Sequence, residues 1–341
     1  MNTSPSLRVT MAQVAKAAGV SRATVSRVLA DSPLVEESTR EHVLAIARSL
    51  GYVRNAAATQ LAGQPGDTIG LLLRDTRNPA YADLYTAMLN TAQDYGLFIT
   101  MMSAGRAHRH GGETNQLERL LSLRPAGIFV CSGLIASQEI EPFANQVPTI
   151  VLPRPETAPT LHNIAYDETG NGHIIADFVA DRGHRAAAVL VTPPDVSYVE
   201  NLRANAICER LSARGVTPVP IDGVLLHSPT ELARQLGARS RLGEFSVAMF
   251  PNDVHALTFL TEARDLGIRV PDDLSVTGID GAGLATAVAG LSTVAVPIPE
   301  AATAAIEHMR RLVEAPHVPT PTIREVYTSH LVPGATVAEI Y

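Results

Sequence analysis

Two short stripes of apolar residues at helical spacing open the chain, over residues 14–18 and 25–29. Apolar positions three and four residues apart lie on one face of a helix, so each stripe predicts a short amphipathic helix. Thr10 and Ser21 precede the two stripes and carry hydroxyl groups that can cap helices, while Gly19 favours a tight turn. The pattern predicts two helices joined by a glycine turn, which is typical of a helix-turn-helix and also of an ordinary helical hairpin.

A third helical stripe runs from Val43 to Leu50 and ends at Gly51. Three helices of this size can bury a small core, so residues 1–54 are expected to form a domain. Residues 55–67 are rich in alanine, glycine and proline. This segment fits either a flexible linker or a helix of about two turns, which is marginal by itself in water.

From residue 68 onward, short apolar runs alternate with longer stripes at helical spacing. The runs predict strands at 68–73, 98–102, 126–131, 149–152, 186–191, 219–222, 246–250 and 274–279. The stripes predict helices at 80–95, 112–122, 171–182, 201–214, 254–266 and 300–313, with a further helix through Leu232 and Leu236. Apolar strands that alternate with helices are typical of parallel sheets covered on both faces, and these are too many for one sheet. We therefore predict an α/β core with two doubly wound lobes.

The charge is divided unevenly along the chain. The whole chain has a formal net charge of −7, but residues 1–66 hold seven basic and four acidic side chains and are therefore net positive. A weakly basic N-terminal segment that contains the predicted helix-turn-helix favours DNA binding. Because one such segment makes few phosphate contacts, we expect two copies to bind together as a homodimer.

No apolar run among the 341 residues is long enough to span a bilayer, and the first ten residues lack the apolar core of a signal peptide. Cys131 and Cys208 lie in apolar segments and are expected to be reduced packing residues. We therefore expect a cytoplasmic protein with no membrane partner.

Residues 9–29 read VTMAQVAKAAGVSRATVSRVL, and the pattern VxxxTRxxVxxxAxxLGYxxN follows over residues 35–55. Both segments closely resemble the DNA-binding headpiece of the lactose-repressor (LacI/GalR) family of bacterial regulators. The resemblance implies that the second helix lies in the DNA major groove. It implies base contacts from Arg22, Ala23 and Arg27, and phosphate contacts from Thr10, Ser21, Thr24 and Ser26.

Arginine most often pairs with guanine O6 and N7, so Arg22 and Arg27 are the expected polar base readers, while Ala23 offers only a methyl group. A phosphate contact is the alternative role for Arg22. Residues 54–63 resemble the hinge helix of the same family, with Asn55 as a possible cap. The resemblance implies that Leu61 inserts between bases in the minor groove, where an apolar wedge kinks the duplex.

The rest of the chain also resembles this family, at Asn78-Pro79, at Gly183-His184-Arg185, at Asn252-Asp253 and over residues 271–280. The resemblance implies a core like that of a periplasmic binding protein, with two lobes joined by crossing strands. By this likeness the N-lobe covers about 68–166 and 297–325, and the C-lobe covers about 167–296 and 326–341.

Ligands of parallel sheets bind beyond the carboxyl ends of the strands, so polar residues after strands are candidates for an effector site. The candidates that position and resemblance together favour are Asn78, Tyr81, Tyr166, Arg203, Asn252 and Asp280. An arginine with amide and carboxylate groups suits hydroxyl-rich or anionic ligands, and Tyr166 can stack on an apolar face of the ligand.

Three departures from the family pattern leave the effector open. The family's usual Asp-Arg after a strand is Pro153-Arg154 here, its usual Gln-Pro is Val296-Pro297, and the chain has no tryptophan. Each change removes a group that commonly contacts a sugar. A plain hexose or pentose and another small metabolite therefore both remain candidates.

Enzyme signatures are missing from the sequence: there is no G-x-S-x-G, no H-E-x-x-H and no phosphate-binding Walker loop. We expect no catalytic residues, no cofactor and no metal. The predicted function is a ligand-responsive transcriptional regulator, a repressor that binds a palindromic operator as a homodimer. The alternatives are a solute-binding protein or a crevice enzyme with the same core fold.

Overall fold

The computed structural model describes residues 9–29, 32–53, 66–103, 112–315 and 320–340. The chain divides into two compact units, Met1–Gly66 and Asp67–Tyr341. Each unit is described by itself below.

The first unit, hereafter the headpiece, contains α1 (Met11–Ala18), α2 (Arg22–Leu29) and α3 (Glu37–Ser49). Thr10 caps α1 through a capping box with Gln13: the Thr10 amide donates to Gln13 Oε1 at 2.8 Å, and the Gln13 amide donates to Thr10 Oγ1 at 3.4 Å. Gly19 ends α1 at a φ of +67°, a left-handed conformation that glycine adopts without steric cost.

The headpiece core lies where its three helices meet. Its buried residues are Val14, Ala15, Ala18, Val25, Val28, Val43 and Ala47. Leu29 and Ile46 pack against them and are half-buried. Leu50, which the sequence pattern placed in the buried stripe, is 39% exposed, because it is the C-cap of α3, where the helix ends.

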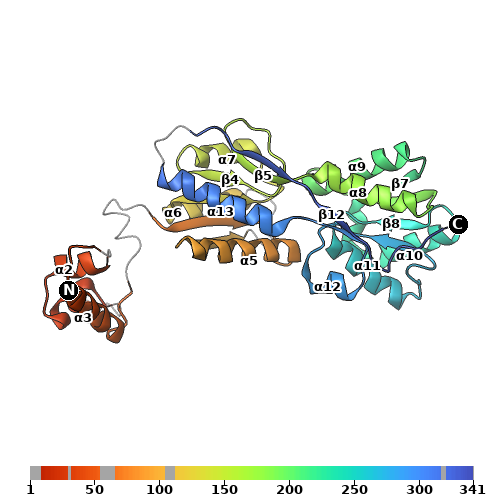
Figure 1. The fold of residues 1–341 in the computed structure, drawn as a ribbon. Coiled ribbons are helices and arrows are strands. Elements are labelled where there is room, and N and C mark those ends of the chain that lie inside the picture. The colour runs from red at the N-terminus through yellow and green to blue at the C-terminus, as the bar shows by residue number, and fades with distance from the viewer. Residues whose placement is uncertain (1–8, 30–31, 54–65, 104–111, 316–319, 341) are drawn as a thin grey trace, which may run out of the picture. The chain divides into compact units, whose positions relative to one another are not determined.

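The second unit begins with a six-stranded parallel sheet in the order β11-β5-β4-β3-β1-β2. Its strands are β1 (Thr68–Leu73), β2 (Phe98–Ser103), β3 (Gly127–Cys131), β4 (Thr149–Val151), β5 (His162–Tyr166) and β11 (Arg324–Tyr327). Helices α5 (Pro79–Asp94) and α13 (Ile298–Glu314) bury their apolar faces on one side of the sheet, and α6 (Gly112–Ser122) and α7 (Ser137–Ala144) do so on the other. These elements form the N-lobe (Figure 1).

The C-lobe is built around a four-stranded parallel sheet in the order β7-β6-β8-β9. Its strands are β6 (Ala186–Val191), β7 (Thr217–Asp222), β8 (Val247–Met249) and β9 (Ser275–Thr277). Helices α8 (Glu168–Asp181) and α9 (Tyr198–Ala213) cover one face, and α10 (Pro229–Arg241) and α11 (Asp253–Asp265) cover the other. A short 3-10 helix, η1 (Gly223–His227), and α12 (Gly283–Val288) complete the lobe.

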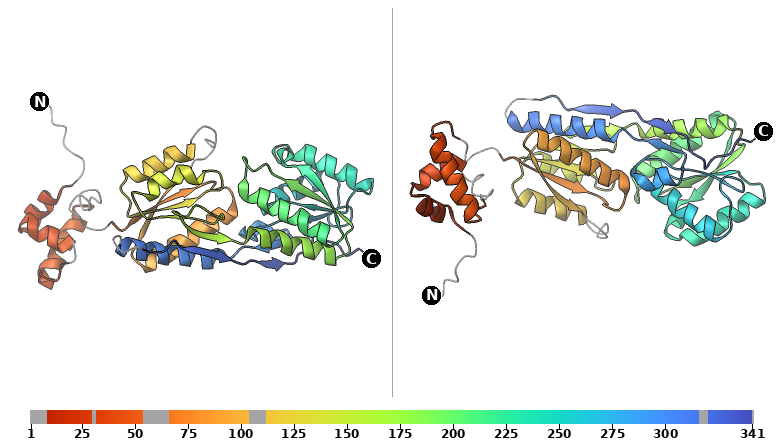
Figure 2. Two further views of the ribbon diagram at one scale, coloured as in Figure 1. Left: turned by 90° about the horizontal axis from the view of Figure 1, so that it is seen from above. Right: turned by 60° about the horizontal axis from the view of Figure 1, so that its bottom comes forward.

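Three chain segments connect the lobes, and Figure 2 shows them on one side of this unit. One runs from β5 into α8, a second from β10 (Thr293–Ala295) into α13, and a third from β11 into β12 (His330–Val332). Strands β10 and β12 pair antiparallel with each other. The predicted α/β class with two parallel-sheet lobes is confirmed.

The sequence pattern missed several short elements. These are α7, α12, β5, β10, β11 and β12. Helix α7 contains Pro142, which weakens any helix prediction, and β11 is a half-exposed edge strand with the polar sequence REVY. Such segments are stabilised by pairing and packing with distant parts of the chain, so their local pattern is weak.

Candidate DNA-binding surface and effector site

Helix α2 presents one polar face to solvent. Its first turn is capped by Ser21, whose Oγ accepts a hydrogen bond of 3.0 Å from the Thr24 amide. Val25 and Val28 are buried against the other helices. The exposed residues of α2 are Arg22, Ala23, Ser26 and Arg27, and Thr24 is half-buried. All the proposed DNA-contacting residues of α2 therefore lie away from the headpiece core.

Thr10 and Ser21 are exposed caps at the starts of α1 and α2. Exposed helix N-termini attract anions through their free amides and the helix dipole, which suits phosphate contacts. Asn55 and Leu61 lie outside the described residues, so their expected hinge roles remain predictions.

In the core, Arg203 on α9 lies at the centre of a buried ionic cluster. Its Nε donates to Glu168 Oε2 at 2.5 Å, and its Nη2 donates to Glu168 Oε1 at 3.2 Å. Its Nη1 donates to Asp280 Oδ1 at 2.9 Å and to the Pro251 carbonyl at 3.1 Å. Sequence reasoning identified Arg203 and Asp280 but missed Glu168, which follows the α8 cap Asp167.

Burial and charge act in opposite directions on this cluster. Burial raises the pKa of Asp280 to about 7, although the Arg203 charge lowers it, and the carboxylates of Asp253 and Glu168 raise it further. Burial lowers the pKa of Arg203, but the carboxylates of Glu168 and Asp280 outweigh that effect and leave it raised. Arg203 therefore stays charged, between Glu168 and an Asp280 side chain that holds its proton up to about pH 7.

The loop that carries Asp280 is tightly constrained. Asp280 has a φ of +137°, which is rare for a residue with a side chain and marks a backbone held by its surroundings. The following Gly281 has a φ of +64°, and a Cβ there would lie 2.4 Å from Ala295 Cα. Asp253 Oδ2 also accepts a 2.7 Å hydrogen bond from the Gly281 amide. The loop thus holds the Asp280 backbone against the segment that crosses to the N-lobe, while its carboxyl group faces Arg203.

Two of the expected effector residues come from the N-lobe and lie near this cluster. Tyr166, at the end of β5, is buried, and Tyr81 on α5 is half-buried. Burial raises the pKa of Tyr81 to about 12, and both Asp280 and Arg203 are close enough to affect it. Burial also raises the pKa of Tyr166, which is likewise within range of Asp280 and Arg203. The structure therefore brings four predicted residues from both lobes together.

The remaining two predicted effector residues take part in helix capping. Asn78 Oδ1 accepts a 2.9 Å hydrogen bond from the Ala80 amide at the start of α5. Asn252 Oδ1 accepts one of 2.9 Å from the His255 amide at the start of α11, and its Nδ2 donates to Glu200 Oε1 at 2.9 Å. The side-chain oxygens of both residues are thus already used locally.

Arg74 joins the two lobes and was not identified from the sequence. It follows β1 in the N-lobe and donates from Nη2 to the Val196 carbonyl at 2.9 Å and from Nη1 to Ser197 Oγ at 3.3 Å. On α12, the Gly283 amide donates to Asp83 Oδ2 on α5 at 3.1 Å. Both contacts join the N-lobe to the C-lobe.

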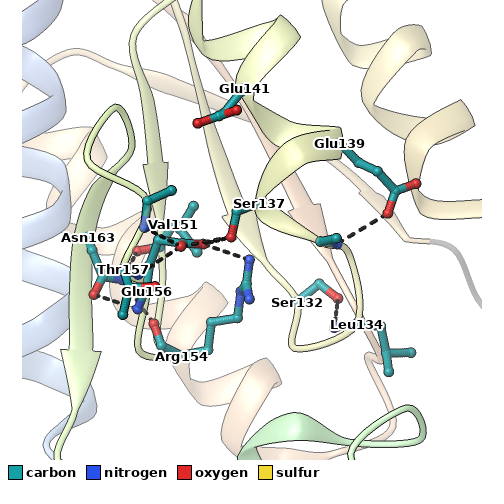
Figure 3. Close-up of polar contacts among 12 residues, drawn as sticks. Ser132, Leu134, Ser137, Glu139, Glu141, Val151, Arg154, Glu156, Thr157 and Asn163 are labelled. Atoms are coloured by element: carbon teal, nitrogen blue, oxygen red, sulfur yellow. Dashed lines mark hydrogen bonds and ion pairs between the residues drawn. The ribbon is translucent and has the colours of Figure 1, made fainter.

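A second arginine of the N-lobe lies just after β4. Figure 3 shows that the side chains of Arg154 and Ser137 both point toward the Glu156 carboxylate. Arg154 Nη2 donates to Glu156 Oε2 at 2.9 Å, and Ser137 Oγ lies 2.8 Å from both Glu156 oxygens. Asn163 Nδ2 donates to the Arg154 carbonyl at 2.9 Å. Because Arg154 follows a predicted strand, its position made it a candidate for the effector site, but it was not among the residues that position and resemblance together favoured.

Three family models match the chain. Residues 10–55 match "Bacterial regulatory proteins, lacI family". Residues 66–242 match "Periplasmic binding proteins and sugar binding domain of LacI family". Residues 176–337 match a periplasmic binding protein-like domain.

Curated relatives match over most of their length. The transcriptional regulator GalR of Escherichia coli is 29% identical over 329 residues, which cover 95% of this chain and 94% of GalR. The regulator DegA of Bacillus subtilis is 29% identical over 307 residues, which cover 86% of this chain and 88% of DegA.

Solved structures share the fold. The lac repressor dimer bound to operator and the anti-inducer ONPF has a TM-score of 0.80 at 23% identity, covering 97% of this chain and 99% of that one. A complex of the regulator CelR with cellobiose has a TM-score of 0.66 at 24% identity, covering 96% of this chain and 100% of that one.

A helix-turn-helix unit followed by a two-lobed binding-protein-like core defines a class of DNA-binding transcriptional regulators. The chain belongs to the LacI family of bacterial regulatory proteins. Members of this family are transcriptional regulators and not enzymes. Among the described residues, no helix is both long and apolar enough to cross a membrane. The same residues contain no group of three or more His, Cys, Asp or Glu side chains that could hold a metal ion.

Proposed function

We propose that this regulator is a repressor that binds a palindromic operator as a homodimer in the cytoplasm and responds to a small metabolite. The observation that carries the DNA-binding part is the solvent-exposed face of α2, with Arg22 and Arg27 free of the headpiece core. In the proposed complex, these two arginines read base edges in the major groove. Ala23 contacts a base through its methyl group, and the phosphate contacts come from Thr10, Ser21, Thr24 and Ser26.

Homodimer binding follows from the charge of the headpiece and from relatives. One headpiece carries a small positive charge, so two copies on one site double the number of phosphate contacts. The solved lac repressor is a dimer bound to operator. In our proposal, the hinge segments of two chains meet at the centre of the operator, where Asn55 caps each hinge helix and Leu61 enters the minor groove.

The effector would bind between the lobes, where Tyr81, Tyr166, Arg203 and Asp280 come together and Asn78 and Asn252 lie at the helix starts. The relative CelR was solved with cellobiose. Each lobe supplies part of this site, so a ligand there contacts both lobes at once. A ligand changes DNA affinity only if it binds two lobe arrangements unequally, and a site shared between lobes meets this condition.

The test is direct DNA binding by the full chain. A duplex selected from a random library with this protein, or the DNA upstream of its own gene, is titrated by fluorescence anisotropy. We expect specific binding that Arg22→Ala and Arg27→Ala each weaken by about tenfold or more, the value of one arginine–guanine contact. Arg234→Ala, at an exposed position of the C-lobe, is the matched control. A solute-binding protein or an enzyme with this core would bind no duplex, and that outcome would reject the proposal.

The hinge proposal has its own variant. Leu61→Ala should weaken specific binding strongly while non-specific binding and the melting temperature stay unchanged, because the leucine would act only in the kinked duplex. Wild-type specific affinity in this variant would rule out the minor-groove wedge.

A further inference from the structure

The Arg203 guanidinium has little hydrogen-bonding capacity left for a ligand. An arginine side chain has five N–H groups, and four hydrogen bonds from Arg203 already go to Glu168, Asp280 and the Pro251 carbonyl. The Glu168 carboxylate pairs with two of its nitrogens at once, as a ligand carboxylate would. Arg203 therefore has no pair of free N–H groups for the carboxylate of an acidic ligand. Its end of the site also carries more carboxyl groups than cations.

The N-lobe side of the site contains a buried arginine with an unused N–H group. The Arg154 side chain is only 9% exposed, yet its Nε is buried without a hydrogen-bond partner. Its partner Glu156 also accepts hydrogen bonds from Ser137 Oγ and from the amides of Thr157 and Ala158. The Glu156 carboxylate thus accepts hydrogen bonds from several groups besides Arg154. A buried charged group with an unpaired N–H favours a further oxygen acceptor.

Neighbouring side chains locate Arg154 at the interlobe site. Tyr81 of the N-lobe and Tyr198 at the start of α9 in the C-lobe are both close enough to affect the pKa of Arg154, which burial lowers and Glu156 raises. Tyr81 is in turn within range of Arg203 and Asp280. Tyr81 therefore lies near Arg154 of the N-lobe and near Asp280 of the C-lobe.

Arg74 is a second cation on this side of the site. Its two side-chain hydrogen bonds go to the Val196 carbonyl and Ser197 Oγ, which are both uncharged. It forms no ion pair with a residue in the described part of the chain. Like Arg154, it lies in range of Tyr81. The N-lobe end of the site thus carries two guanidinium groups, of which Arg154 is paired with Glu156 and also lies in range of Glu113. The C-lobe end carries Arg203 with the carboxyl groups of Glu168 and Asp280.

We propose that the effector is a polyhydroxylated carboxylic acid, such as a sugar acid. Its carboxylate would pair with Arg154 and Arg74 in the N-lobe, and its hydroxyl groups would donate to Asp280 in the C-lobe. A planar carboxylate with two acceptor oxygens fits two guanidinium groups that each lack a full set of partners. The side chain of Pro153, before Arg154, offers no acceptor for a hydroxyl at this end. This inference rests on the proposed function, because it concerns the same site.

The experiment compares matched ligands on the purified full chain. The probes are D-glucose with D-glucuronate and D-gluconate, D-galactose with D-galacturonate and D-galactonate, and D-glucose 6-phosphate. Differential scanning fluorimetry and calorimetry measure the shift in melting temperature and the affinity. We expect an acid to bind at least about tenfold more tightly than its neutral partner, as one charge-assisted pair provides. Tighter binding of a neutral sugar or of the phosphate, or no binding of any acid, would overturn the inference.

Two variants connect the preference to Arg154. Arg154→Met should remove the preference for the acid and leave binding of the neutral partner unchanged. Because Arg154→Met leaves Glu156 without its cation and can impair folding, the double variant Arg154→Met with Glu156→Gln removes both charges. Arg119→Ala, on the exposed face of α6, is the control. If the folded double variant kept the acid preference, Arg154 would not be the anchor.

Operator binding without ligand is measured on the same preparations. If the wild type binds DNA but prefers no acid, the effector inference fails while the regulator function stands. If it binds no DNA, the proposed function itself fails.

Discussion

Arg74 and Ser197 belong to opposite lobes and are joined by a hydrogen bond of 3.3 Å from Nη1 to Oγ. A second bond of 2.9 Å links Arg74 Nη2 to the neighbouring Val196 carbonyl. Ser197 is also the N-cap of α9, the helix that carries Arg203. One side chain at the end of β1 therefore connects the N-lobe directly to the helix that supplies the buried arginine of the effector site.

Replacing Arg74 should free the lobes to separate. Arg74→Ala removes two hydrogen bonds from a charged donor, a loss of about 1–3 kcal/mol. Spin labels at Arg119→Cys and Arg234→Cys, in a Cys208→Ser background, should report longer and broader interlobe distances by pulsed electron spin resonance. Arg77→Ala is the control, because Arg77 pairs with Asp75 in its own turn. Identical distance distributions in all three proteins would show that this contact does not hold the lobes.

The two roles of Ser21 can be separated by charge. Ser21→Ala should lower headpiece stability by about 1 kcal/mol, because the Thr24 amide loses its cap. Ser21→Asp restores the cap and should regain that stability, measured by urea unfolding. If Ser21 also contacts a phosphate, the aspartate should still weaken operator binding at low salt. Wild-type operator affinity in Ser21→Asp would leave Ser21 with the capping role alone.

Gly172 allows α8 and α9 to pack closely. A Cβ at this position would lie 2.7 Å from Ala206 Cβ and 2.8 Å from the Arg203 carbonyl oxygen. Gly172→Ala should push the helices apart and destabilise the core by about 1–3 kcal/mol. Gly70→Ala is the control, since its nearest neighbour would lie 3.4 Å away on a leucine side chain. Equal melting temperatures for the two variants would contradict this packing argument.

Asp280 should make core stability depend on pH. Burial raises the pKa of Asp280 to about 7, so the folded state keeps a proton that the unfolded chain releases near pH 4. The resulting stabilisation is present at low pH and is lost as pH rises through about 7. Denaturant unfolding of wild type and Asp280→Asn is measured between pH 5 and 8. The free energy of unfolding of the wild type, relative to that of Asp280→Asn, should fall as pH rises.

His184 changes the pH dependence of stability in the opposite direction. Its contribution cancels when the free energies of unfolding of wild type and Asp280→Asn are subtracted. Burial lowers the pKa of His184 to about 4, so its contribution to stability rises with pH between about 4 and 6.5. This contribution is common to wild type and Asp280→Asn. A pH-independent difference between the two proteins would therefore mean that Asp280 is ionised throughout.

The local parts of the molecule could be predicted from the sequence. The spacing of apolar residues predicted β1 at 68–73 and β6 at 186–191 with the observed bounds, because a strand buried on both faces reads as a continuous apolar run. The caps Thr10 and Ser21 and the turn at Gly19 were predicted because capping depends on residues within three or four positions. The exposed face of α2 follows from the same local periodicity.

The effector site depended on tertiary structure. Arg203 and Glu168 are 35 residues apart, and Arg74 and Ser197 are 123 apart, so no local pattern pairs them. Strands β5 (HNIAY) and β11 (REVY) are short and contain polar residues, and they pair with each other across the chain. The sequence by itself determined that the headpiece is helical and that each lobe is α/β, because backbone propensity and apolar spacing act over a few residues. Only the fold decided which charges meet, since burial brings distant side chains together and removes the water between them.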